Sequence, residues 1–184
     1  MDKHDQTAAA PAKKSLTHEI LGWAWILPAA FLANLVIQNY AFAQTEVRSI
    51  SMQSTLYEGQ RLIEDKLSYR FHGPEHGDIV VIDGPEYKDR LVKRLIGLPG
   101  DVIDMKDGRV YVNGSLLEEP YVKGTTYPAG LAVPYTVPED HVFVMGDNRE
   151  RSTDSRQLGP IALTSIEGKA VLRVWPPKDF GQVE

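Results

Sequence analysis

The chain has 184 residues, which is room for one ordinary domain with a tail or a membrane anchor. Hydrophobic residues make up 42% of it, which argues against a disordered protein, and the absence of cysteine excludes a disulfide framework or a thiolate metal site. The net charge of -5, without a basic block, argues against a nucleic-acid partner. The histidines show no metal-ligand spacing, so we expect neither a metal nor another cofactor.

The first predicted element is a membrane-spanning helix. No charged residue occurs from Ile20 to Thr45, and residues 20–37 are mostly apolar. Eighteen helical residues reach roughly 27 Å, close to the hydrocarbon thickness of a bilayer. We therefore expect a transmembrane helix over 20–43, preceded by a polar cytoplasmic tail over 1–19, because the lysines before the helix favour a cytoplasmic amino terminus.

Two other interpretations of this apolar stretch stay open. A buried core helix would carry a polar face, which the stretch lacks. A cleavable signal peptide would be cut after Ala43, because Ala41-Phe42-Ala43 has the small-x-small pattern. The long polar leader and the long apolar run fit an uncleaved anchor better.

Beyond residue 46 the chain alternates between short apolar runs and Gly- or Pro-containing turns, without a long amphipathic helix. This pattern predicts an all-β sandwich or barrel-like domain over 44–184, with single helical turns at most at 54–58 and 164–167. The segment 104–140 is expected to leave the core as a small β extension of hairpin and loop. Strands are predicted at 77–83, 91–95, 141–145 and 169–175, and an Asn-Gly hairpin at 110–117.

A serine pair follows the apolar stretch directly. Ser49 and Ser51 are two residues apart, so in an extended strand both side chains would project to the same face. Ser51 could then attack a carbonyl, while the Ser49 hydroxyl and the Ser51 N–H stabilise the resulting oxyanion. Taken alone, a serine pair of this kind is more typical of a turn.

Lys93 interrupts an apolar strand and lies on the face opposite Val92 and Arg94. If that face is buried, desolvation lowers the lysine pKa from about 10.4 and makes the amine a base that can take a serine proton. A single lysine in a strand is more often solvated. The tight turn over 97–101 directly after it favours burial.

A third segment, residues 145–156, concentrates charged and hydroxyl side chains. Ser152 could accept from the Lys93 amine and direct it toward Ser51. Such a cluster is usually a salt-bridged surface loop, but its dense polar residues between a strand and a turn favour a loop fixed by its own network. His141, Asp147 and a serine could in principle form a triad, although no spacing singles them out.

These segments, in this order, resemble the bacterial type I signal peptidases, which are membrane-bound Ser-Lys proteases. The resemblance covers the apolar span and Val47 to Trp175, including Gly-Asp-Ile-Val-Val at 77–81. It implies an antiparallel β catalytic domain with a small β extension, Ser51 as nucleophile and Lys93 as general base. It further implies Ser49 as oxyanion donor, Ser152 as the lysine-orienting hydroxyl, supporting ion pairs from Arg94, Asp147, Asp154 and Arg156, and substrate pockets lined by Val47, Met52, Leu56 and Val92.

The resemblance also implies what the protein acts on and where. The family removes signal peptides from exported preproteins, cutting after small residues at the first and third positions before the scissile bond. We therefore expect a single-pass protein of the bacterial cytoplasmic (inner) membrane, with an extracytoplasmic catalytic domain, in contact with membrane lipid and possible export machinery. Two positions depart from the family pattern, since Ile50 replaces the usual glycine and Ser54 the usual proline.

Two further functions were weighed. A self-cleaving repressor of the related Ser-Lys fold would be cytoplasmic, and the apolar span argues against it. A non-catalytic membrane-anchored β scaffold would tolerate loss of Ser51 or Lys93, yet both are present with their supporting residues.

Overall fold

The computed structural model describes residues 22–84 and 89–183. The cytoplasmic tail expected over 1–19 lies outside these residues. The chain divides into two compact units, Met1–Gln38 and Asn39–Glu184, which we describe separately.

The first helix with defined bounds is α2 (Ile26–Tyr40), which contains no charged residue. Its large apolar side chains are exposed, among them Leu27, Phe31 and Leu32. No helix within the described ranges is both long and apolar enough to cross a membrane. The expected span over 20–43 is wrong at its carboxyl end, because α2 stops at Tyr40 and the backbone from Phe42 onward pairs with another strand.

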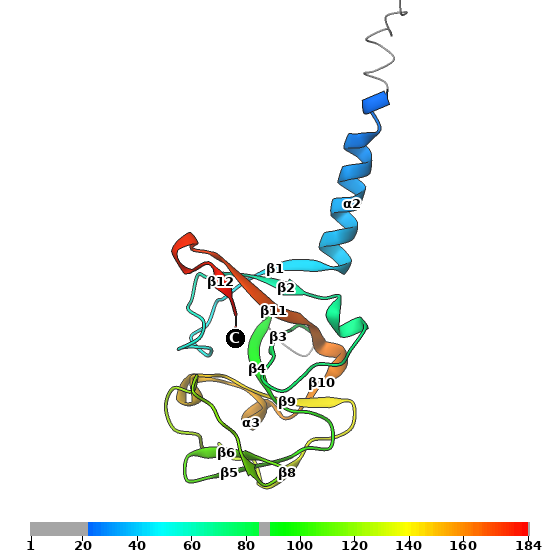
Figure 1. Ribbon diagram of the computed structural model, residues 1–184. Coiled ribbons are helices and arrows are strands. Elements are labelled where there is room, and N and C mark those ends of the chain that lie inside the picture. Colours follow the sequence, from blue (N-terminus) through cyan, green and yellow to red (C-terminus); the bar gives the residue numbers. More distant parts are fainter. Residues whose placement is uncertain (1–21, 85–88, 184) are drawn as a thin grey trace, which may run out of the picture. The chain divides into compact units, whose positions relative to one another are not determined.

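The second unit is built around an eight-stranded sheet in which every pairing is antiparallel, so the mainly β prediction is confirmed (Figure 1). The strand order is β1-β2-β11-β3-β4-β9-β10, with β12 paired to β11. The strands are β1 (Phe42–Glu46), β2 (Arg61–Asp65), β3 (Ile79–Ile82), β4 (Leu91–Gly97), β9 (His141–Met145), β10 (Ile161–Ala162), β11 (Ile166–Trp175) and β12 (Gly181–Gln182).

A second, four-stranded sheet of order β7-β6-β5-β8 forms the expected extension. Asn113 and Gly114 both have positive φ, 52° and 80°, which is the backbone that a two-residue Asn-Gly hairpin requires. Ile103 and Val110 of this sheet pack with Phe143 of β9. The extension is therefore joined to the main sheet by a shared core. Its strands are β5 (Val102–Lys106), β6 (Arg109–Val112), β7 (Ser115–Leu116) and β8 (Tyr135–Thr136).

Strand β4 is buried on both faces, and this determines the surroundings of Lys93. Val92 belongs to one apolar cluster together with Met52 and Leu56, whereas Leu95 belongs to another that includes Val80 and Val144. β3 pairs with one edge of β4 along residues 91–94, and β9 pairs with its other edge from Arg94 onward. A side chain on either face of this strand is thereby removed from water.

The remaining helical elements are single turns. The helical turn expected at 54–58 is not formed, because residues 51–55 make a non-helical turn, whereas the turn expected near 164 is present as a 3-10 segment. These elements are η1 (Ser68–Arg70), η2 (Arg149–Arg151), α3 (Ser155–Leu158), η3 (Leu163–Ser165) and η4 (Pro177–Asp179).

Candidate active site

The serine segment brings two hydroxyl groups into contact. Ser49 Oγ lies 3.0 Å from Ser51 Oγ, and Ser51 is only 4% exposed. The expected extended strand is absent here, because β1 ends at Glu46 and Ser51 begins a turn. The turn is held in place by Met52 and Leu56, whose side chains are fully buried in the core.

Lys93 is buried in the middle of β4, opposite Val80 of β3, and is 3% exposed. Desolvation lowers the pKa of its amine from 10.5 to about 8. The carboxylate of Asp154 opposes this shift, the guanidinium of Arg156 adds to it, and Asp147 opposes it. Near neutral pH a usable fraction of this amine is therefore unprotonated and able to accept a proton.

The carboxylate of Asp147 is bound by Arg94 rather than by the lysine. Arg94 Nε donates to Asp147 Oδ1 and Nη2 to Oδ2, both at 2.9 Å, and Asp147 has no exposed surface. Thr55 Oγ1 donates to the same carboxylate at 2.5 Å. This pair ties the turn after Ser51 to the strand of Lys93 and to the loop after β9 (residues 146–154).

A second bidentate pair lies within the loop and the start of α3. Arg156 Nε and Nη2 donate to the two oxygens of Asp154 at 2.8 and 2.9 Å. The N–H of Gly146 donates to Asp154 as well, at 3.0 Å. Burial alone would raise the pKa of Asp154, but the bonds from Arg156 and Gly146 hold it below its usual range. Within the described ranges no carboxylate forms an ion pair with Lys93, since both nearby acids are paired with arginine.

Residues 51–55 form the turn that carries Ser51, which we call the serine turn. Gly146 lies where this turn approaches Ser152. A Cβ atom at Gly146 would lie 2.5 Å from the Ser51 carbonyl oxygen and would overlap the Ser152 hydroxyl. The N–H of Asn148 donates to the same Ser51 carbonyl at 2.9 Å. Ser152 is 8% exposed, and its Oγ has no hydrogen-bond partner in the described part of the chain. A buried hydroxyl is thus held beside the backbone of Ser51, close enough to Asp154 to help lower the pKa of that carboxyl.

The extension also contributes to this region, which the sequence did not indicate. The guanidinium carbon of Arg94 lies 3.7 Å from the centre of the Tyr121 ring. Arg149 is buried and donates to Thr126 Oγ1 at 2.6 Å and to Glu119. Arg149 was expected to form an ion pair, but its partners on the extension were not predicted. Asn148 and Tyr121 were not predicted as site residues: Asn148 lies inside the charged segment and could have been found there, whereas Tyr121 carried no local signal.

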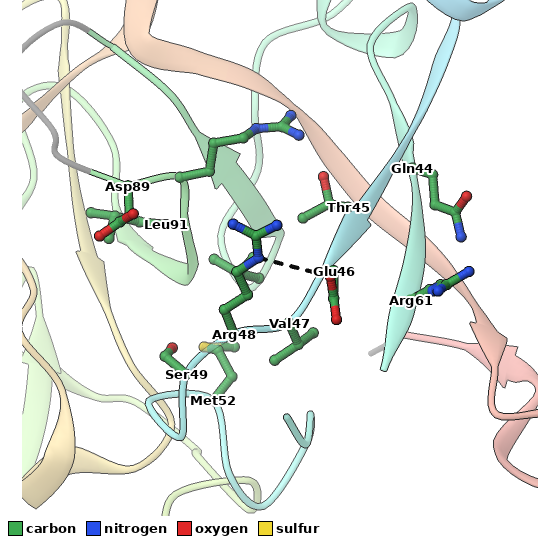
Figure 2. A pocket seen from close by; sticks show the side chains of 12 residues that line it. Gln44, Thr45, Glu46, Val47, Arg48, Ser49, Met52, Arg61, Asp89 and Leu91 are labelled. Carbon is green, nitrogen blue, oxygen red and sulfur yellow. Dashed lines mark ion pairs between the residues drawn. The ribbon is translucent and has the colours of Figure 1, made fainter. Parts of the chain in front are cut away.

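A pocket of about 600 Å³ runs alongside the serine turn (Figure 2). One wall consists of residues 44–49, and the other consists of residues 89–92. Val47, Met52 and Val92, three of the expected substrate-pocket residues, line it, whereas the fourth, Leu56, belongs to the same apolar cluster but does not reach the pocket. In Figure 2, Ser49 and Met52, which flank Ser51 in the sequence, lie on one side of the pocket, and Gln44 and Arg61 lie on the opposite side.

The fold and the site define an antiparallel β protein equipped with the groups of a serine hydrolase. The family described as "Signal peptidase, peptidase S26" matches residues 20–175. Signal peptidase I T of Bacillus subtilis is 35% identical over 193 aligned positions, covering 100% of both chains. Probable signal peptidase I-2 of Synechocystis sp. is 38% identical over 158 positions, which is 83% of this chain and 72% of its own.

A solved structure of a signal peptidase I from Enterococcus faecalis is 36% identical, with a TM-score of 0.46, and the match covers 52% of this chain and 95% of that one. The chain belongs to the S26 signal peptidase family, and it is a serine protease of the signal peptidase I kind.

Proposed function

We propose that this chain is a membrane-anchored endopeptidase that removes signal peptides from exported preproteins, with Ser51 as nucleophile and Lys93 as general base. The observation that carries the proposal is the burial of Lys93, which brings the pKa of its amine to about 8. A lysine in water would be almost fully protonated at neutral pH and could not act as a base. Family membership supplies the class of reaction.

The proton transfers follow from these two roles. The neutral Lys93 amine takes the proton of the Ser51 hydroxyl as its oxygen attacks the scissile carbonyl. The Ser49 hydroxyl, 3.0 Å from Ser51 Oγ, and the Ser51 N–H donate to the oxyanion that develops. The protonated lysine then delivers its proton to the leaving amine, and a water molecule activated by Lys93 hydrolyses the acyl-enzyme.

The supporting residues orient the lysine and limit the rise of its pKa that nearby carboxylates cause. We assign Ser152 as the hydroxyl that orients the Lys93 amine, because its Oγ is buried, unpartnered within the described residues and next to the Ser51 backbone. Asp147 and Asp154 would raise the lysine pKa if they were free. Their pairing with Arg94 and Arg156 limits that effect while fixing the loop.

The pocket suits an extended peptide with small side chains. Among residues 22–84 and 89–183, β1 is the last strand of its sheet and residues 91–93 pair only with β3, so two strand edges border the pocket. An extended chain lying there can bond to such edges. Val47, Met52 and Val92 give the pocket apolar walls near Ser51. This supports cleavage after small residues at the first and third positions before the scissile bond.

We assign the first unit as the membrane anchor. The support is the uncharged stretch of residues 20–45 and the exposed apolar side chains of α2. In this arrangement residues 1–19 are cytoplasmic and the domain from residue 44 onward is extracytoplasmic, in a bacterial inner membrane. Membrane lipid and the protein-export machinery are the partners this location implies.

A direct test uses the full chain in detergent or liposomes with a preprotein that carries an Ala-x-Ala site. We expect one cut after the second alanine, identified by amino-terminal sequencing of the product, and no cut by Ser51→Ala. Cleavage by folded Ser51→Ala at the wild-type rate, or a cut at another kind of site, would refute the proposed function.

A further inference from the structure

Glu64 is a buried carboxylate that lies outside the proposed catalytic groups. It lies in β2, pairs with Ala43 of β1, and has no exposed surface. A buried charge is strongly unfavourable unless other groups compensate it. Here Thr45 Oγ1 donates to Glu64 Oε2 at 2.8 Å, and Arg90 Nη2 donates to both carboxylate oxygens at 3.0 Å. Lys66 Nζ lies 3.4 Å from the same carboxylate.

Two of these partners belong to opposite walls of the pocket. Thr45 comes from the wall formed by residues 44–49, and Arg90 comes from the wall formed by residues 89–92. Figure 2 shows Thr45 and Glu46 on one side and Asp89 and Leu91 on the other. Glu64 therefore connects the two walls through its bonds to Thr45 and Arg90. We call Thr45, Glu64 and Arg90 the wall-connecting network.

Arg90 is held from several directions, which makes the connection firm. Besides Glu64 it bonds to Glu167 of β11, and its Nε lies 3.7 Å from Asp83. Lys66 pairs with the same Glu167. The other ion pair of the pocket differs: Glu46 and Arg48 are 3.8 Å apart, and both side chains are largely exposed. A pair of that kind contributes little to fixing a structure.

The geometry points to the wall-connecting network as a specificity determinant. The network fixes the width of the pocket at the end away from Ser51. A pocket of fixed width favours binding of the substrate residues that lie upstream of the small-x-small site. This inference rests on the proposed function, which places the residues before the scissile bond in this pocket. Thr45 precedes Ser49 by four positions, a span of roughly 13 Å in an extended chain. The network therefore acts at about the fifth residue before the scissile bond.

Such a role predicts an effect that depends on substrate length. Two peptides share one Ala-x-Ala site, but one begins eight residues before the scissile bond and the other begins three residues before it. The quantity measured is the specificity ratio, kcat/KM for the long peptide divided by kcat/KM for the short peptide. In the full-length protein we expect Glu64→Gln and Arg90→Gln each to lower this ratio by about fivefold. We expect the loss to appear as a higher KM for the long peptide, while kcat on both peptides stays within about twofold. The reason is that the variants lose contacts to the upstream residues that are equally strong in the bound substrate and in the transition state.

Glu58→Gln is the matched control, since it removes one exposed carboxylate of the same domain that belongs to neither the pocket nor the network. We expect it to leave the ratio unchanged. Thr45→Val removes the hydroxyl that donates to Glu64 and keeps the shape of the side chain. If Glu64→Gln does not fold, Thr45→Val and Arg90→Gln together test the role of the network. Folding of each variant is checked by its circular dichroism spectrum and thermal midpoint.

An unchanged ratio in the folded network variants would overturn the inference. So would an equal fall in Glu58→Gln, which would indicate an effect of overall charge, or an equal loss of kcat on both peptides, which would indicate a general loss of order. Failure of the proposed function has a different signature: the wild-type protein would cleave neither peptide, or Ser51→Ala would cleave both.

Discussion

The backbone N–H of Asn148 donates a 2.9 Å hydrogen bond to the carbonyl oxygen of Ser51. This bond joins two segments almost a hundred residues apart in the sequence. A nucleophile on a turn needs a rigid partner, because small displacements of a reacting group reduce rates steeply. The loop after β9 provides that partner, and it carries Gly146 and Ser152 to the same place.

The first prediction concerns the dependence of activity on pH. Lys93 acts as a base only when it is neutral, so kcat/KM should rise with pH and level off above a midpoint near its pKa of about 8. The measurement is kcat/KM from pH 5 to 10 with a peptide substrate whose own groups do not titrate in that range. A rise of kcat/KM with pH that disappears in His141→Ala would assign the base to the histidine instead.

The second prediction concerns stability. The pKa of Lys93 is about 8 in the folded protein and 10.5 in the unfolded chain. Burying the charged amine therefore lowers the free energy of unfolding. This destabilisation has its full size below pH 8, decreases as the pH rises from 8 to 10.5, and is absent above pH 10.5. Lys93→Met should therefore unfold with a higher free energy than the wild type at pH 7, by on the order of 3 kcal/mol. Urea titrations at pH 7 and pH 10 measure it. A variant less stable than the wild type at pH 7 would contradict the desolvated lysine.

The third prediction separates two serines of the same segment. Ser152→Ala should lower kcat by on the order of a hundredfold, because the lysine loses its orienting hydroxyl. Ser155 Oγ instead accepts from the Val144 N–H at 2.9 Å, so Ser155→Ala should lower stability by about 1–3 kcal/mol and leave kcat nearly unchanged. Equal and mild effects on kcat would mean that Ser152 has no part in the reaction.

The fourth prediction concerns Gly146. A methyl group there would meet the Ser51 carbonyl at 2.5 Å and the Ser152 side chain, so the serine turn must move. We expect Gly146→Ala to lower kcat by about a hundredfold. Gly73→Ala is the control, since a Cβ at Gly73 meets nothing within 4 Å and should change kcat by less than about twofold. Full activity of Gly146→Ala would show that this close approach is unnecessary.

The fifth prediction is that the membrane-extracted protein keeps residues 1–43. The small-x-small site runs from Ala41, whose carbonyl accepts from the Lys66 N–H at 2.9 Å, into β1, where Phe42 pairs with Asp65 and Ala43 pairs with Glu64. A bond in a paired strand cannot enter an active site unless that pairing opens. Intact-mass measurement should therefore show the uncut chain in both wild type and Ser51→Ala. A wild-type protein that begins mainly at Gln44 would identify the stretch as a cleavable signal.

Strands whose signal is local were predictable. β9 lies at residues 141–145 as expected, because a run of apolar residues is bounded there by turns. The hairpin at Asn113-Gly114 was predictable for the same reason, since both residues tolerate positive φ.

Elements whose signal depends on tertiary contacts were not predictable. In β2 the inward positions are Leu62 and Glu64, and a carboxylate at a buried position hides the alternation that marks a strand. β1 was hidden within an uncharged stretch that indicated a helix. In the site, the sequence suggests which residues react, and those roles stay predictions. The burial of Lys93 depends on neighbouring strands, and the contact of Tyr121 with Arg94 depends on the extension, so neither could be predicted.

The stacking of Tyr121 on Arg94 and the bond of Arg149 to Glu119 have a consequence for protein engineering. The segment between β7 and β8 is a structural part of the reactive region, so it cannot be exchanged between related enzymes as an independent module. A chimera that receives a foreign extension must also receive partners for both arginines. Grafts that keep positions 119 and 121 should remain active, and shorter grafts that omit them should fold with a loosened catalytic loop.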